Sequence, residues 1–410
     1  MRSLLSVNNY YYPRGGAEVV FLSHNQMFEA MNWRVIPFSM RHPKNIQSDW
    51  SEYFIDEIEY GSNYSVLEKI KRVPKTIYSL EARSQLNKLI ANNQFDICHV
   101  HNIYHHISPS IFSLLKKKQI PVVMTLHDLK IACPAYSMLA KDGICERCKQ
   151  NKIYNVLIQR CIKNSVLLSG VVMVESMLHK MLGTYHQYVD KFVVPSKFYI
   201  EKLVEWGWDR QRFIHIPNFV DLKSFQPEYT PGDYFLYFGR LSREKGLVTL
   251  IKSACKAGVP LKIVGTGPDD EALKKLVQAS DANNIEFLGY LTGDPLHSVI
   301  RSALAVILPS EWYENAPVSL MESYALGKPV IGAEIGGIPE LIKQDICGSV
   351  FKSGSFDELT SLLQKYAALP GEQVTEMGRA GRAWMEDDFS LEQYQSRILS
   401  LYRDLGAAQE

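Results

Sequence analysis

The chain has 410 residues, of which 46% are hydrophobic and 22% charged, so it is long enough for two domains and too apolar to be a disordered protein. Its formal net charge of +1 gives no general attraction to nucleic acid. No apolar run reaches the roughly 18 residues that span a bilayer, and the N-terminus lacks the pattern of a signal peptide. Seven cysteines, an odd number, suit a reducing compartment better than a disulfide framework. We therefore expect a cytoplasmic protein of two domains.

Short β-branched strands alternate with helical stretches from one end of the chain to the other. This alternation predicts an α/β fold of two doubly wound, Rossmann-like domains that face a central cleft, with ligands at the carboxyl ends of the strands. The first series of expected strands is Ser3–Val7, Arg34–Phe38, Ile97–His101, Val122–Leu126, Lys191–Val194 and Phe213–Ile216. The second series is Tyr234–Phe238, Leu261–Val264, Ile285–Leu288, Ala305–Leu308 and Pro329–Gly332.

A stretch punctuated by Pro227, Pro231 and Gly232 separates the two series, which favours a domain boundary there. We assign residues 1–222 to the first domain and residues 223–390 to the second. The last segment, residues 391–410, has a helical pattern, and we expect it to pack back on the first domain.

Two carboxylates, Glu314 and Glu322, stand eight positions apart across the start of a predicted helix. Asn315 is a good N-cap, Pro317 suits the first turn, and Gly327 ends the helix. Glu314 is therefore expected on the loop before the helix and Glu322 about two turns inside it. Free backbone N–H groups between them form an anion site. An anion flanked by two carboxylates that bind hydroxyls describes a nucleotide-diphosphate-sugar.

Arg240 and Lys245 lie in a turn that follows a strand and leads into a helix. From there both cations can reach the mouth of the cleft, where charge develops on a diphosphate leaving group. Two solvated surface cations are the alternative for this pair taken alone. Beside Glu314 and Glu322, the pair favours a diphosphate clamp.

Three glycine turns follow strands at positions that would face the cleft: Gly15-Gly16, Gly265-x-Gly267 and Gly336-Gly337. Glycine lets the backbone approach a ligand closely and tolerates positive φ. We expect these turns to contact the ligand, although each one alone is also typical of an ordinary tight turn.

His127 ends the expected strand Val122–Leu126. It would contact the donor sugar or stabilise the positive charge that develops there, and a local bond to Asp128 is the alternative. Further histidines crowd the end of a neighbouring strand and are interpreted as mostly structural or acceptor-side residues. They are His99, His101, His105 and His106.

On these motifs the chain resembles the family 4 glycosyltransferases, retaining enzymes with the two-Rossmann GT-B fold, over nearly its whole length. Glu314-x7-Glu322 together with Arg240 and Lys245 carries most of the resemblance. The resemblance implies that the two cations bind the donor diphosphate, that Glu322 holds the ribose hydroxyls and that Glu314 contacts the donor sugar. It also places His127 beside the anomeric centre.

The resemblance further implies that Gly16 closes over the phosphate. We expect catalysis to require no cofactor, because Arg240, Lys245 and helix N-termini would take the role of a divalent metal on the diphosphate. Asn315-Ala316-Pro317 departs from the commoner family pattern, so the sugar is not specified. The expected donor-binding residues are Gly15, Gly16, Arg240, Lys245, Gly265, Gly267, Glu314, Asn315, Ala316, Pro317, Val318 and Glu322.

Four cysteines, Cys133, Cys145, Cys148 and Cys161, follow His127 with the spacing Cys-x11-Cys-x2-Cys-x12-Cys. A Cys-x2-Cys pair bracketed by two further cysteines has the spacing of a structural zinc site. We predict one structural zinc, with four unrelated thiols as the alternative.

Two basic runs, residues 69–75 and 116–118, fall in the first domain. They are typical of solvated helix faces, and the alternative is contact with anionic lipid headgroups. Such contact would hold the protein at the inner membrane face and would suit a lipid-linked acceptor.

Taken together, these features predict a retaining glycosyltransferase that moves a sugar from a nucleotide-diphosphate-sugar to a glycan or lipid-linked acceptor, in surface polysaccharide or glycoconjugate biosynthesis. We expect no nucleic-acid partner. A nucleotide-sugar epimerase of similar fold and an inactive scaffold that binds sugar nucleotides remain as alternatives. The intact Arg240, Lys245, Glu314 and Glu322 argue against the scaffold.

Overall fold

The computed structural model describes residues 1–57, 74–280 and 282–407. All eleven expected strands are confirmed, with ends within two residues of the predicted ones. The strands of the first half of the chain are β1 Ser3–Val7, β2 Arg34–Phe38, β3 Ile97–Val100, β4 Val122–Thr125, β5 Leu139–Ala140, β6 Gly143–Ile144, β7 Lys191–Val194 and β8 Phe213–His215. Those of the second half are β9 Phe235–Phe238, β10 Leu261–Val264, β11 Ile285–Gly289, β12 Ala305–Leu308, β13 Val330–Glu334 and β14 Gly348–Lys352.

These strands form two parallel sheets of six strands and one small antiparallel hairpin, β5–β6. The first sheet has the order β2-β1-β3-β4-β7-β8, and the second has β11-β10-β9-β12-β13-β14. In each sheet the order reverses beside the first strand, between β1 and β3 and between β9 and β12. A crevice for ligands opens at such a switch point, at the carboxyl ends of the strands.

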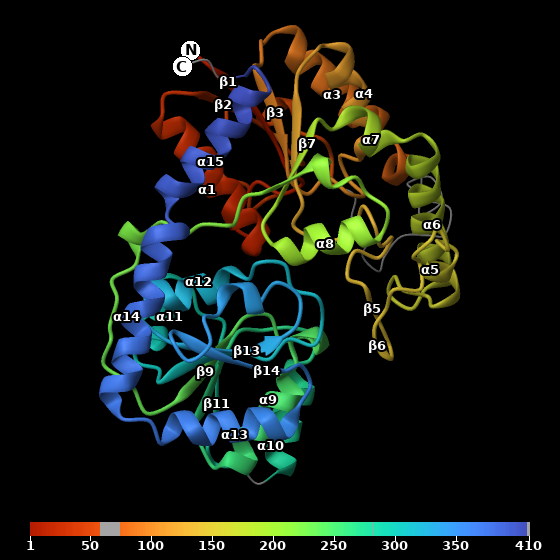
Figure 1. Ribbon diagram of the computed structural model, residues 1–410. Coiled ribbons are helices and arrows are strands. Elements are labelled where there is room, and N and C mark those ends of the chain that lie inside the picture. The colour runs from red at the N-terminus through yellow and green to blue at the C-terminus, as the bar shows by residue number, and fades with distance from the viewer. Residues whose placement is uncertain (58–73, 281, 408–410) are drawn as a thin grey trace.

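Helices cover both faces of each sheet, as a buried parallel sheet requires (Figure 1). Within the described ranges, no helix combines the length and hydropathy needed to cross a membrane. The helices that belong with the first sheet are α1 Gly16–Ala30, α3 Leu80–Ala91, α4 Phe112–Lys117, α5 Asn155–Ile158, α6 Val166–Met181, α7 Thr184–Tyr188, α8 Lys197–Glu205 and α15 Leu391–Asp404. The others are α9 Leu247–Ala257, α10 Asp270–Ala279, α11 Gly293–Arg301, α12 Val318–Ala325, α13 Phe356–Ala367 and α14 Gly371–Asp388.

Successive side chains of the strands fill separate cores on the two faces of each sheet, because a strand points them alternately to opposite sides. In β1, Leu5 packs in one core and Leu4 in the other. The core around Leu4 also holds Tyr394 and Tyr402 of α15. The last helix therefore lies on the first sheet beside α1, although it comes at the end of the chain (Figure 1).

The chain crosses between the two sheets twice, once after β8 and once between α14 and α15. The two crossings run side by side. The backbone N–H of Val220 donates to the carbonyl of Phe389 at 3.0 Å, and Val220 forms a parallel bridge with Ser390.

Candidate active site

The strongest candidates for chemistry lie at the switch point of the second sheet. Arg240 follows β9, and Glu314 lies on the loop after β12. Lys245 ends a short 3-10 turn, Arg243–Lys245, that leads into α9. Because β9 and β12 are neighbours, the fold brings the three side chains to one edge of the sheet.

Glu314 is buried, with 7% of its surface exposed. Lys245 Nζ lies 2.6 Å from its Oε1 atom, and the hydroxyl of Ser310 donates to the same oxygen at 2.7 Å. Burial raises the pKa of Glu314, but the ammonium of Lys245 and the polar side chains of Trp312 and Ser310 together hold the pKa below its ordinary value. Glu314 is therefore an ionised, oriented acceptor at neutral pH.

Arg240 is exposed, and its side chain makes no hydrogen bond or ion pair with the described residues. Its carbonyl accepts a hydrogen bond from the Tyr237 hydroxyl at 2.9 Å, which holds the turn. Burial raises the pKa of Tyr136, on a loop of the first domain, while Arg240 and Arg14 lower it. Arg240 thus faces the first domain, and Arg14 is a further cation near the same place. Sequence reasoning missed Arg14, although it directly precedes the Gly15-Gly16 pair.

The start of α12 differs from the prediction. Asn315 is not the N-cap and Pro317 is not in the first turn: Pro317 itself is the N-cap, with extended backbone, and the helix begins at Val318. The amide of Asn315 instead bridges the two domains. It donates to the carbonyl of Leu126 at 2.9 Å and accepts from the hydroxyl of Ser196 at 2.8 Å.

Glu322 is the fifth residue of α12 and so lies just over one turn inside it, where the sequence predicted two. Its side chain is half-buried and makes no hydrogen bond or ion pair with the part of the chain that the structure describes. Burial raises its pKa to about 7. A carboxylate desolvated without a partner is available for a ligand.

Close backbone contacts require glycine at these positions in the turns of the second domain. A Cβ atom on Gly265, which has φ +135°, would lie 1.8 Å from the carbonyl oxygen of Gly239, and one on Gly267 would lie 2.1 Å from that of Leu241. The turn at Gly336-Gly337 packs in the same way on the backbone of residues 314 and 315. These glycines therefore shape the loops that carry Arg240 and Glu314.

Gly15 and Gly16 are exposed at the start of α1. Gly15 is extended at −166° and Gly16 is the first helical residue, so neither uses the positive φ that glycine tolerates. A Cβ atom on Gly16 would lie 3.5 Å from the Cγ2 atom of Val318. The pair therefore faces the first turn of α12 across the cleft.

Two further bonds connect the domains around this loop. Asn218 donates to the carbonyl of Ala316 at 2.9 Å, and Glu340 accepts from the backbone N–H of Lys197 at 2.8 Å. Ala316 is buried. The loop between Glu314 and α12 thus touches the first domain at several points and lies at the seam.

His127 follows β4 and bonds to a neighbouring histidine, in place of the local bond to Asp128. Its Nε2 atom lies 2.8 Å from the Nδ1 atom of His101, whereas Asp128 accepts from the backbone N–H of Lys130. Burial lowers the pKa of His127 to about 4, so the imidazole is neutral at pH 7. His101 stacks in turn on His99.

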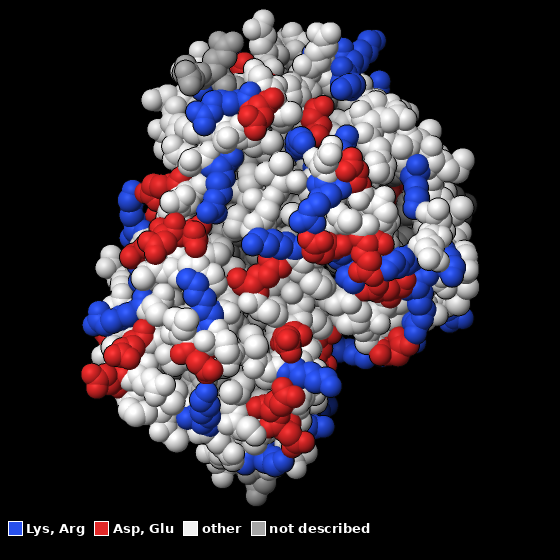
Figure 2. All heavy atoms as spheres, in the orientation of Figure 1, with Lys and Arg blue, Asp and Glu red and all other residues white. Residues whose placement is uncertain are grey.

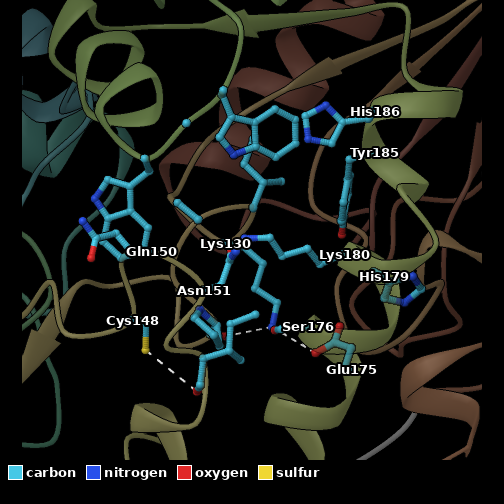
Figure 3. A pocket seen from close by; sticks show the side chains of 17 residues that line it. Lys130, Cys148, Gln150, Asn151, Glu175, Ser176, His179, Lys180, Tyr185 and His186 are labelled. Atoms are coloured by element: carbon cyan, nitrogen blue, oxygen red, sulfur yellow. Dashed lines mark hydrogen bonds and ion pairs between the residues drawn. The ribbon is translucent and has the colours of Figure 1, made fainter.

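A cavity of about 130 Å³ lies in the first domain and is lined in part by the loop that follows β4. Lys130 and Glu175, from this loop and from α6, point toward each other inside it (Figure 3), and their ion pair measures 2.9 Å. Burial raises the pKa of Glu175, but Lys130, His105 and His179 together hold it below its ordinary value. The cavity also contains Cys148, one of the four clustered cysteines.

The first basic run lies outside the described residues, apart from Lys75, which pairs with Glu81 at 2.9 Å. The second, residues 116–118, is exposed at the end of α4. Figure 2 shows acidic and basic side chains interspersed over the face that it presents.

Comparison with known proteins agrees with this architecture. A family model described as "Glycosyltransferase Family 4" matches residues 14–224, and one described as "Glycosyl transferases group 1" matches residues 221–384. The chain is 25% identical over 352 residues to an uncharacterized 42.6 kDa protein in the cps region of Klebsiella pneumoniae, covering 83% of this chain and 87% of that one. It is 26% identical over 227 residues to the putative colanic acid biosynthesis glycosyltransferase WcaL of Escherichia coli, covering 51% and 55%.

Two solved structures have the same fold. Sucrose-phosphate synthase from Thermosynechococcus elongatus has a TM-score of 0.74 at 19% identity and is covered completely, as is this chain. Anabaena HepE in complex with UDP-glucose has a TM-score of 0.67 at 15% identity, covering 98% of this chain and 100% of that one. The expected GT-B fold is therefore confirmed.

Proposed function

Because the chain belongs to Glycosyltransferase Family 4, we propose that it moves a sugar from a nucleotide-diphosphate-sugar to a glycan or lipid-linked acceptor. The observation that carries this proposal is the ion pair of Lys245 with buried Glu314 at the switch point of the second sheet. Exposed Arg240 lies on an element beside it, as does Glu322, whose side chain bonds to none of the described residues. The cations suit a diphosphate, and the two separate carboxylates suit the hydroxyl groups of the sugar and the ribose on either side of it.

In the proposed complex, Arg240 and Lys245 bind the diphosphate. An ammonium has three donors, so Lys245 can keep its bond to Glu314 and still donate to phosphate oxygens. Glu314 would then accept from sugar hydroxyls with its second oxygen, and Glu322 would accept from the ribose. The two cations and the backbone N–H groups at the start of α12 stabilise the charge that develops on the leaving group.

For the transfer we propose front-face attack with retention. The bond from the anomeric carbon to the diphosphate oxygen breaks, and the acceptor oxygen bonds to the same face. The proton of the acceptor hydroxyl passes to the departing phosphate. Glu314 is held by Lys245 and Ser310, which suits a binding carboxylate better than a free nucleophile. Neutral His127 would donate to or accept from the sugar.

The relatives suggest the pathway class. WcaL is named for colanic acid biosynthesis, and HepE was solved with UDP-glucose. We propose a corresponding place for this chain in the assembly of a surface polysaccharide or glycoconjugate, with a nucleoside diphosphate as the second product.

A panel of nucleotides and nucleotide-sugars tests the proposal. UDP, GDP, ADP and their sugars are compared by thermal shift, because a ligand at 100 times its dissociation constant adds about 2.7 kcal/mol to folding stability. Bound sugars are then assayed for transfer, hydrolysis and epimer formation. Epimer formation would identify an epimerase, and binding without turnover of any acceptor would identify a scaffold.

Arg240→Ala should lower the transfer rate about 100-fold, because it removes a charge-assisted contact to the leaving group. Arg403→Ala is the control. Arg403 is exposed near the end of α15, away from the switch point of the second sheet. Equal rates in the two variants would contradict the clamp.

We also propose that α6 docks on an anionic membrane surface, near a lipid-linked acceptor. Three of the four side chains that this helix buries are polar, Ser169, Glu175 and His179, and the fourth is Val172. Its exposed side is apolar, with Val174 49% and Met181 82% exposed. The other exposed apolar side chains on or beside this helix are Ile158, Val166, Leu167, Met177 and Leu182.

Cations border this apolar surface. Lys152 and Arg160 are exposed at the two ends of α5, directly before α6. An apolar stripe with flanking cations is the composition that binds at an anionic headgroup interface. We therefore expect sedimentation of the protein with vesicles that contain phosphatidylglycerol and much less with phosphatidylcholine alone.

Met181→Asp should abolish that sedimentation. The control is Val248→Asp, which places the same charge on α9, where Val248 is 48% exposed. Sedimentation of both variants with the anionic vesicles would contradict the assignment of α6.

A further inference from the structure

The four cysteines predicted as zinc ligands surround one small cavity. Cys133, Cys145, Cys148 and Cys161 all line it, and its volume is about 10 Å³, which is roughly the space of one water-sized sphere. They come from four separate places: the loop after β4, the end of the β5–β6 hairpin, the turn beyond it and the end of α5. All four thiols therefore border the same small space, beside apolar side chains such as Leu139 and Val156.

The segment that holds these cysteines has little regular structure to stabilise it. Its only described strands are the two-residue β5 and β6, and α5 has four residues. Seven of the twelve non-glycine residues with positive φ in the described chain lie between 136 and 164, a conformation that side chains disfavour. These seven are Tyr136, Met138, Gln150, Asn151, Arg160, Lys163 and Asn164. Met138 and Val156 of this segment pack in the core of the first domain, and a cross-link would order the irregular backbone between them.

We propose that Cys133, Cys145, Cys148 and Cys161 bind one structural Zn²⁺ through their four thiolates. Tetrahedral coordination by four sulfurs is the ordinary form of a closed zinc site. The guanidinium of Arg147 lies 3.8 Å from the Cys145 sulfur and also pairs with the carboxylate of Asp142, so its charge is shared between the two.

The sulfur atoms are not yet at ligand spacing. Among the described residues, only His24, His99 and His101 form a group whose ligand atoms all lie within 4.8 Å of one another, so no three of the cysteine sulfurs do. Zinc would draw the thiolates inward and close the small cavity. The histidine group is a weaker candidate, because His24 and His99 already bond to Tyr394 and Tyr402.

Zinc at this position would also shape the larger cavity of the first domain. Cys148 lines both cavities and therefore forms part of the wall between them. The same segment leads through α5 into α6, whose Glu175 pairs with Lys130 inside the larger cavity. The metal would thus hold the first domain's cavity in shape while lying outside the donor site.

The test uses the full chain, purified without a chelating column and dialysed against metal-free buffer. Elemental analysis should find about one zinc per chain. Titration with a mercurial reagent should release that zinc in step with four thiols. Replacement by Co²⁺ should produce the thiolate charge-transfer and tetrahedral ligand-field bands. Cys148→Ser should reduce bound zinc to below about 0.2 per chain, whereas the control Cys255→Ser, on α9, should retain it.

Three outcomes would overturn the proposal. The first is wild-type protein with less than about 0.2 zinc per chain whose thiols all react freely in the native state. The second is a cobalt spectrum without thiolate bands, which remains decisive where Cys148→Ser fails to fold. The third is fewer than the seven titratable thiols in denatured, unreduced, metal-free protein, which would indicate disulfides.

Discussion

The Nδ1 atom of His101 lies 2.8 Å from the Nε2 atom of His127, and the two rings stack with centroids 5.1 Å apart. Burial lowers the pKa of both imidazoles, so both are neutral at pH 7, and one nitrogen of the pair donates while the other accepts. His101 thereby selects the tautomer and the ring orientation of His127. It acts as a positioning residue and need not touch the sugar.

We predict that His101→Phe lowers the rate of transfer about 10-fold without weakening nucleotide binding. Phenylalanine keeps the stacked ring but removes one hydrogen bond, worth roughly 1–1.5 kcal/mol. Rates and calorimetric affinities are measured on the same preparations, with His297→Phe on α11 as the control. His101→Gln, which can still hydrogen bond, should recover part of the rate. A nucleotide affinity that falls as far as the rate would contradict this role.

The buried histidines should make folding stability sensitive to acid. Burial lowers the pKa of His24 to about 3 and that of His127 to about 4, from 6.5. Below pH 6.5 the unfolded chain binds protons that the native chain does not, so the free energy of unfolding falls as the pH falls toward 4. Each such histidine contributes about 1.4 kcal/mol per pH unit in that window.

His24→Phe should therefore reduce the pH dependence of stability by about one proton. Urea unfolding of wild type and variant between about pH 4.5 and pH 8 measures the difference. Parallel curves at every pH would show that His24 is protonated alike in both states.

Nucleotide binding should depend on the ionisation of Glu322. Burial raises its pKa from 4.5 to about 7, and a ribose diol is best accepted by the ionised form. Affinity should therefore fall about 10-fold per pH unit below pH 7 and level off above it. Glu322→Gln should bind more weakly and without this pH dependence, whereas Glu334→Gln, exposed at the end of β13, should behave as wild type. Calorimetry with the free nucleotide gives both curves, and an unchanged profile in Glu322→Gln would assign the titration to another group.

Lys245 should matter for stability as well as for rate. Lys245→Met leaves the buried carboxylate of Glu314 without its cation, which costs about 3 kcal/mol in comparable pairs, and removes a diphosphate contact worth about 100-fold in rate. Glu314→Gln should lower transfer but spare binding of the free nucleotide. Compared with Lys245→Met, the double variant Lys245→Met/Glu314→Gln should recover most of the lost folding stability but none of the lost transfer rate. Denaturant unfolding and transfer kinetics on the three variants separate the two effects.

Asn315→Ala should weaken the contact between the domains. It removes the bonds to Leu126 and Ser196, each worth about 1 kcal/mol. We expect a higher KM for the donor with a smaller change in kcat, because the cleft closes less well. Asn284→Ala is the control: Asn284 donates only to carbonyls of its own domain, those of Ala254 and Val259. A change confined to thermal stability in both variants would contradict a role in closure.

The sequence predicted the strands well because their signal is local: β1 and β9 are short runs of buried apolar residues between helices. It missed β14, which begins with Gly348 and Ser349, and the two-residue strands β5 and β6. β14 forms by pairing with a neighbouring strand, and β5 and β6 form through a tight turn. The hydrophobic periodicity of the sequence does not reveal such elements.

The candidate site shows the same limit at the level of single residues. Glu314, Glu322, Arg240 and Lys245 could be named from spacing alone. The true start of α12 could not, because Asn315 bonds to residues 189 and 119 positions away rather than to its own helix. Local capping preferences carry no information about such partners. The bond between His101 and His127 was equally invisible, since it joins the ends of two strands.

The paired crossings at Val220 and Phe389–Ser390 have a mechanical consequence. A single connecting segment would leave the two domains free to rotate about it. Two connecting segments joined by a backbone bond resist twisting of one domain against the other. Hinge bending then remains as the easier motion. Opening by bending about this pair of segments should separate Gly16 from Val318, which are in contact distance in the structure, without sliding one past the other. The register across the cleft would then be the same each time it closes.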